Sequence, residues 1–198
     1  MTDSDFDRWL VAAKRGDETA FVMLFRSTQP KLLRYLRAMG GALADDVASE
    51  TWVAVVRGLD RFEGEEMGFR AWVFTIARAR LIDAQRRAGR TPAPVDVAEL
   101  LESRPDGVDV ADRVEEIFAT EAALALVARL PKDQAEVVLL RHIVGLDVAH
   151  CSRILGKRPG TVRVLAHRGL GRLEMLLGAG PEKYDVPWCN AIDESVGY

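Results

Sequence analysis

The sequence has few of the features that mark secreted, membrane-embedded or catalytic proteins. It contains two cysteines, Cys151 and Cys189, too few for a disulfide framework. No apolar run approaches the length of a membrane span. The first residues, MTDSDFDRWL, lack the basic start and apolar stretch of a secretory signal. We therefore expect a cytoplasmic protein with reduced thiols and no membrane insertion.

Motifs for catalysis and metal binding are also missing. The sequence contains no phosphate-binding loop, nucleophile elbow or zinc-protease motif. His150 and Cys151 are neighbours, but adjacent residues on a helix point about 100° apart, and no paired Cys or His motif has the spacing of metal ligands. We expect no catalytic residue, no metal and no cofactor, and we do not expect an enzyme.

Sustained alternation of apolar and polar residues, the pattern of a half-buried β-strand, is absent as well. The 198 residues are 48% hydrophobic, enough for one ordinary core or two small ones. Helical periodicity predicts helices after Asp17, again after Pro30, over Ala44–Leu59 and over Phe69–Arg90. We expect an all-α fold of two small helical domains joined by an acidic flexible linker, with a helix-turn-helix in the C-terminal domain.

Charge is unevenly distributed along the chain, although the net charge is only −3. Residues 70–90 contain six arginines and one aspartate, and residues 153–172 contain six basic residues and no acidic one. Between them, residues 93–121 contain nine acidic residues and two arginines. Two separate basic segments indicate a nucleic-acid-binding protein, whereas the acidic run is most simply a solvated spacer.

Residues 145–173 have the pattern of a DNA-reading helix-turn-helix. The first helix is expected to start at the N-cap Asp147 and to end at Gly156. The second is expected to restart at Gly160 or Thr161, because Pro159 cannot continue the preceding helix. Its core-facing positions are Val162, Ala166, Gly169 or Leu170, Leu173 and Leu177. The candidate DNA-binding residues of its other face are Arg158, Thr161, Arg163, Val164, His167, Arg168 and Arg172.

Two blocks of sequence carry a family resemblance. The amino block contains GDETAFVMLFRSTQPKLLRYLRAMGG, ADDVASETWVAVVRGLDRFEG and FRAWVFTIARARLIDAQRRAGR. The carboxyl block is ALALVARLPKDQAEVVLLRHIVGLDVAHCSRILGKRPGTVRVLAHRGLGRLEMLL. In order and spacing they resemble the two conserved domains of bacterial sigma factors of the sigma-70 family, extracytoplasmic-function (ECF) subgroup.

The resemblance implies a transcription initiation factor that binds core RNA polymerase and directs it to promoters by reading and melting a minus-ten element and reading a minus-thirty-five element. Bacterial core RNA polymerase and promoter DNA are then the partners, and an anti-sigma factor is a further one. The implied division is a region 2-like domain over residues 1–92, an acidic linker over 93–113, a region 4-like helix-turn-helix domain over 114–178 and a C-terminal tail over 179–198.

The resemblance also assigns roles to the amino block. DDVASETW corresponds to the segment that docks on the polymerase clamp helices; Asp46 and Glu50 lie four residues apart and so share a helix face, and together with Arg57 they are the core polymerase-binding candidates. Trp52 is expected in the core. The usual Ala-Arg-Asn of the family reads Ala-Arg-Ala at 77–79. The minus-ten DNA-binding candidates are Arg70, Arg78, Arg80, Arg86 and Arg87.

In the carboxyl block, we expect Arg163, Val164 and His167 to reach base edges. The phosphate-binding candidates are Arg158, Arg168 and Arg172. Two alternatives remain at this point. One is a stand-alone helix-turn-helix regulator, against which the amino block argues because such a regulator needs a sensor or dimerisation domain instead. The other is a helical protein-interaction module, which weak DNA binding without salt dependence would favour.

Overall fold

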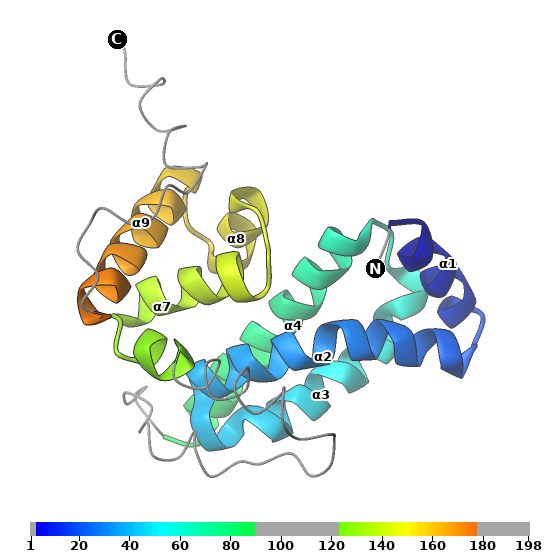
Figure 1. Cartoon of the computed structure of the whole chain (residues 1–198). Coiled ribbons are helices and arrows are strands. Elements are labelled where there is room, and N and C mark those ends of the chain that lie inside the picture. The colour runs from blue at the N-terminus through cyan, green and yellow to red at the C-terminus, as the bar shows by residue number, and fades with distance from the viewer. Residues whose placement is uncertain (1–2, 90–122, 178–198) are drawn as a thin grey trace, which may run out of the picture.

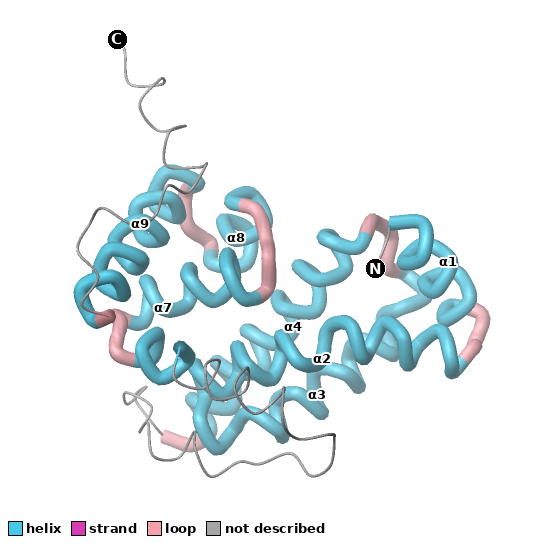
Figure 2. Tube along the Cα trace, viewed as in Figure 1, coloured by secondary structure: helices cyan, strands magenta, loops and turns pink. Residues whose placement is uncertain are grey.

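The computed structural model describes residues 3–89 and 123–177, and every regular element in those ranges is helical, as Figures 1 and 2 show. This confirms the expected all-α fold. The proposed linker 93–113 and tail 179–198 lie outside the described residues, as do residues 90–92 and 114–122. The α-helices labelled in Figure 1 are α1 (Asp3–Lys14), α2 (Glu18–Gly40), α3 (Ala44–Gly58), α4 (Glu66–Arg87), α7 (Lys132–Val138), α8 (Val148–Leu155) and α9 (Pro159–Leu176). Residues 123–128 are helical as well.

Helix α2 begins where the sequence predicts and continues further than expected. The Asp17 side chain accepts a hydrogen bond from the Ala20 backbone N–H at 3.0 Å, which confirms the N-cap. Pro30 lies inside the helix and does not start a new one. It has no N–H for the carbonyl of Arg26, but both residues are exposed, so water can hydrogen-bond to that carbonyl.

The amino half packs α1 to α4 around large apolar side chains. Trp52 of α3 is only 7% exposed and its ring contacts Phe25, with centroids 4.8 Å apart. This confirms that Trp52 is a core residue. Trp72 of α4 is half-buried and stacks on Phe62, with centroids 5.1 Å apart. The aromatic rings therefore fill the space between α2, α3 and α4.

The carboxyl half contains the predicted helix-turn-helix. Asp147 caps α8 by accepting a hydrogen bond from the His150 N–H at 2.7 Å, and Gly156 ends α8 with a φ of +64°. Helix α9 starts at Pro159, not at Gly160 or Thr161. The first residue of a helix has no intrahelical partner for its N–H, so proline fits there at little cost.

Helix α9 packs closely on α7 at Gly169. A Cβ atom at this position would lie 2.7 Å from Cγ2 of Val138 and 3.4 Å from the carbonyl oxygen of Gln134. Val162, Ala166 and Gly169 are buried as expected, whereas Leu177 is 58% exposed. Leu177 lies eight residues beyond the contact, about 12 Å along the helix axis, so the apolar stripe leaves the core before the helix ends.

The two halves are in direct contact. Helix α4 packs against α8, and α2 packs against α7 and the π-helical turn Leu139–Ile143 that follows it, as Figure 1 shows. The buried apolar side chains of both halves form one connected cluster. Among residues 3–89 and 123–177, no helix combines the length and apolar composition needed to cross a membrane.

Replacing Gly169 with alanine is expected to lower the free energy of unfolding by about 1–3 kcal/mol, because the added methyl group overpacks the contact with α7. Gly171 on the same helix is the matched control, since a Cβ there meets no atom within 4 Å. G171A should gain about 0.5–1 kcal/mol from helix propensity. Chemical denaturation of the full chain followed by circular dichroism compares the two variants; changes of the same sign would contradict the close approach.

Candidate nucleic-acid and protein-binding surfaces

The outer face of α9 presents the predicted DNA-binding residues together. It lies opposite the buried residues Val162, Ala166 and Gly169, and Val164 at its centre is 47% exposed. A basic, exposed helix face after a tight turn is the geometry of a recognition helix. The exposed candidates are Arg158, Thr161, Arg163, Val164, His167, Arg168 and Arg172.

Helix α8 packs against α9. The Asp147 carboxylate, besides capping the helix, lies 2.9 Å from Nδ1 of His150. The backbone hydrogen bond from His150 is the main cause of a lowered pKa at Asp147. Cys151 on the same helix is fully buried, and burial raises the pKa of its thiol to about 11.

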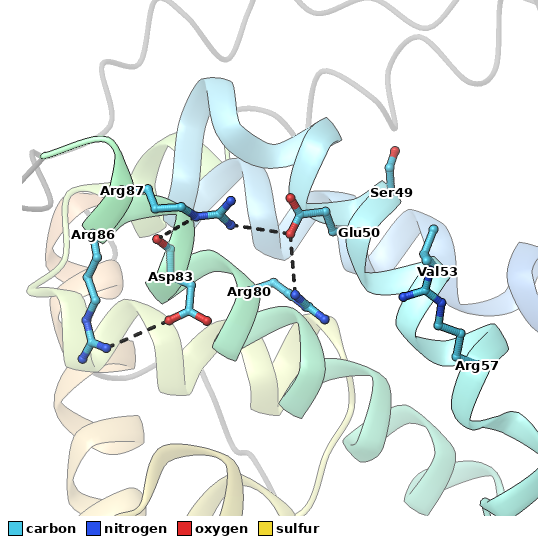
Figure 3. Close-up of a pocket in the computed structure, with 8 residues that line it drawn as sticks. All are labelled: Ser49, Glu50, Val53, Arg57, Arg80, Asp83, Arg86 and Arg87. Atoms are coloured by element: carbon cyan, nitrogen blue, oxygen red, sulfur yellow. Dashed lines mark hydrogen bonds and ion pairs between the residues drawn. The ribbon is translucent and has the colours of Figure 1, made fainter.

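A second surface lies between α3 and α4. It is a groove of about 740 Å³, lined by four arginines, two carboxylates, Ser49 and the half-exposed Val53. Figure 3 shows these side chains. Glu50 of α3 lies between two arginines of α4, with Oε2 4.0 Å from Nη1 of Arg80 and 3.7 Å from Nη2 of Arg87. The charged residues lining the groove are Glu50, Arg57, Arg80, Asp83, Arg86 and Arg87.

The groove brings together residues to which the sequence assigned two different roles. Glu50 and Arg57 are polymerase-binding candidates, whereas Arg80, Arg86 and Arg87 are minus-ten candidates. Asp46, the third polymerase-binding candidate, is also exposed on α3. No pattern in the sequence links α3 to α4 across the intervening loop, because only tertiary packing brings these side chains together.

The remaining minus-ten candidates, Arg70 and Arg78, do not join the groove. Arg70 pairs with Glu66 and donates a hydrogen bond from Nη1 to the carbonyl oxygen of Val144 at 3.1 Å. Arg78 pairs with Glu136 of α7, with Nε 2.8 Å from Oε1. Both arginines therefore contact the carboxyl half of the chain.

Sequence reasoning missed two residues of this junction, Tyr35 and Glu136. The fully buried Tyr35 donates a hydrogen bond from its hydroxyl group to Oε1 of Glu136 at 2.9 Å. Burial and the neighbouring carboxylate raise the pKa of Tyr35 well above its usual value, so its hydroxyl group stays a donor. The available signal was a glutamate inside the apolar run AEVVLL, because a charge at a core position needs a partner.

Comparison with known proteins identifies both halves. The family model Sigma-70 region 2 matches residues 24–91, and Sigma-70, region 4 matches residues 120–173. The ECF RNA polymerase sigma factor ShbA of Streptomyces griseus is 36% identical over 174 residues, which are 83% of this chain and 91% of ShbA. The chain belongs to the ECF RNA polymerase sigma factors.

Further comparisons agree with this assignment. The ECF sigma factor BldN of Streptomyces coelicolor is 33% identical over 180 residues, covering 88% of this chain and 68% of BldN. The structure of sigma factor RpoE in complex with the anti-sigma factor NepR, from Bartonella quintana, superimposes with a TM-score of 0.57 at 22% identity, covering 80% of this chain and 96% of RpoE, and so shares the fold. As an ECF sigma factor, the chain is a transcription initiation factor that binds core RNA polymerase and directs it to promoters.

Among the described residues of this sigma factor, no group of three or more His, Cys, Asp or Glu side chains is arranged to hold a metal ion. The α3–α4 groove falls within the region 2 match, and α7, α8 and α9 as far as residue 173 fall within the region 4 match. The two candidate surfaces therefore lie on different conserved regions of the family.

Stability of the helix-turn-helix is expected to depend on pH through Asp147. Its folded pKa lies below the unfolded value, so the stabilisation by the carboxylate is present above about pH 3.9 and is lost as the pH falls through the folded pKa. Asp147→Asn keeps an oxygen for the cap but carries no charge, and should lower stability by about 0.3–1 kcal/mol at neutral pH.

Urea denaturation of both proteins over a range of pH measures this difference. The two stabilities should converge at acidic pH, once the wild-type carboxyl group is protonated. A difference that stayed constant through that range would show that the Asp147 charge does not stabilise α8.

Proposed function

We propose that this sigma factor divides promoter recognition between the surfaces described above. The observation that carries the proposal is the match of regions 2 and 4, in order, together with identity to ShbA over 91% of that protein. Membership of the family disfavours a stand-alone helix-turn-helix regulator. Residues 1–92 would form the region 2 domain, 93–113 the linker, 114–178 the region 4 domain and 179–198 a tail.

The exposed face of α3 is the proposed polymerase-docking surface. Asp46 and Glu50 contribute negative charge, Arg57 contributes a cation, and the half-exposed Val53 and Val56 contribute apolar contact area. The two valines lie three residues apart on α3 and so form a small apolar patch that a protein partner could cover. Because Glu50 also lies near Arg80 and Arg87, Asp46 is the cleaner position at which to test docking.

The C-terminal half of α4 is the proposed contact for the minus-ten element. Arg80, Arg86 and Arg87 are 46%, 79% and 65% exposed, respectively, in their side chains, and arginines along a groove can follow the backbone of a separated strand. Arg70 and Arg78 belong to the same set but require the contacts with the carboxyl half to be released. Phosphates of the DNA strand would then pair with these arginines in place of the protein carboxylates.

The outer face of α9 is the proposed reader of the minus-thirty-five element. Arg163, Val164 and His167 would reach base edges in the major groove. Arg158, Arg168 and Arg172 would hold phosphates, and Thr161 near the start of the helix is a further contact. The protein would act in the cytoplasm, perform no chemistry itself, and be open to control by an anti-sigma factor such as the one that binds RpoE of Bartonella quintana.

Charge reversal at Asp46 is expected to weaken binding to bacterial core RNA polymerase at least about tenfold, because like charges facing each other in an interface cost several kcal/mol. Size-exclusion co-elution of purified chain and core polymerase, followed by titration, measures the loss. Asp7→Lys on α1 makes the same charge change at another exposed position of the same half. Equal co-elution of both variants would refute α3 as the docking surface.

Base and phosphate contacts of α9 are expected to respond differently to mutation. In the assembled holoenzyme, Arg163→Ala should cost about 1–3 kcal/mol and relax discrimination at one base pair of the promoter. Arg168→Ala should weaken all sequences alike and reduce the slope of log affinity against log salt by about 1. Promoter-fragment titrations at several salt concentrations separate the two; identical behaviour would refute the division of roles.

A further inference from the structure

One carboxylate joins the two halves of the chain. Glu136 of α7 is 4% exposed. Its Oε1 atom accepts hydrogen bonds from the hydroxyl group of Tyr35 in α2 at 2.9 Å and from Nε of Arg78 in α4 at 2.8 Å. Nη2 of Arg78 lies 3.5 Å from Oε2. Two helices of region 2 therefore hold a single side chain of region 4.

The contact occupies Arg78 with an anion supplied by the protein itself. A guanidinium group binds carboxylates and phosphates with the same set of N–H donors. The Nε atom of Arg78 already donates to Glu136, and the arginine side chain is only 27% exposed. While it holds Glu136, Arg78 therefore has its charge neutralised and its Nε donor occupied, so it is a poor partner for a DNA phosphate in this geometry.

A second contact between α4 and the carboxyl half reinforces the first. Arg70 lies two turns before Arg78 on α4, and its Nη1 atom donates to the carbonyl oxygen of Val144 at 3.1 Å. Val144 caps the π-helical turn that follows α7. The outer face of α9 remains exposed in the same structure. Contact between the two halves thus covers the region 2 arginines nearest to region 4 and leaves the recognition helix accessible.

We propose that Glu136 is an intramolecular latch, which keeps the free sigma factor closed and occupies Arg78 in place of a promoter phosphate. Release requires a competing anion on Arg78 and solvation of the Glu136 carboxylate, so polymerase and DNA must supply the free energy of opening by binding the open form better. The inhibitory role rests on the proposed function, because it takes Arg78 as a DNA-binding residue.

The test removes the charge of Glu136 in the full chain. Glu136→Gln keeps the size of the side chain and its oxygen but no longer neutralises Arg78. The radius of gyration from small-angle X-ray scattering should increase. Affinity of the free chain for a fluorescein-labelled, A/T-rich single-stranded oligonucleotide should rise about tenfold, the equivalent of one charge-assisted hydrogen bond lost from the closed form.

Asp133→Asn is the matched control. Asp133 lies on α7 as well and pairs with Lys157 within region 4 at 2.8 Å. It acts on Arg78 only through its charge, so this variant removes the same charge from the same helix without removing a hydrogen bond of the junction. It should leave the radius of gyration unchanged and alter DNA affinity little. Tyr35→Phe, which removes one donor and no charge, should shift both measurements in the direction of Glu136→Gln, and circular dichroism verifies that each variant is folded.

The outcomes separate the latch from the proposed function. An unchanged radius of gyration in folded Glu136→Gln, or an equal change in Asp133→Asn, would overturn the latch. A larger radius with unchanged DNA affinity would overturn its inhibitory role and the assignment of Arg78 to DNA. Binding to core polymerase, tested through Asp46, would remain a separate result in either case.

Discussion

A buried negative charge requires a positive partner and hydrogen-bond donors at set distances, and Glu136 obtains them only when the two halves of the chain are together. Leaving such a carboxylate unpaired away from water costs several kcal/mol. Apolar contacts are non-directional, so the shared core alone does not define how α7 sits on α2 and α4. The donors from Tyr35 and Arg78 define it, and the packing of α8 against α4 follows from the same placement.

The arginines of α4 consequently serve two different environments. Arg70 and Arg78 face region 4 and are tied to groups of that half, whereas Arg80 and Arg87 face α3 and lie near Glu50 at 4.0 and 3.7 Å. The pairs near Glu50 are long and partly exposed, so water and salt weaken them. The groove arginines are thus available to a partner at low cost, while those at the junction are not.

Local signals in the sequence were sufficient to predict several helix ends and the exposed face of α9. The caps at Asp17 and Asp147 and the turn at Gly156 depend on neighbouring residues alone, and the face of α9 follows from its periodicity. The helix starts predicted after Pro30 and after Pro159 were wrong, because the tolerance of a helix for proline depends on solvent exposure and on position in the helix. The partners of Arg78 and Arg70 lie 58 and 74 residues away, a distance over which periodicity carries no information.

The buried thiol of Cys151 has a consequence for how signals reach the recognition helix. Oxidants and disulfides react with the thiolate form of cysteine. Because burial raises the pKa of Cys151 to about 11 and its side chain is inaccessible, it stays a protonated thiol at neutral pH. Cys151 is therefore a poor target for oxidants in the folded protein. A redox stimulus that alters the helix-turn-helix would have to react at another residue or be transmitted by another molecule.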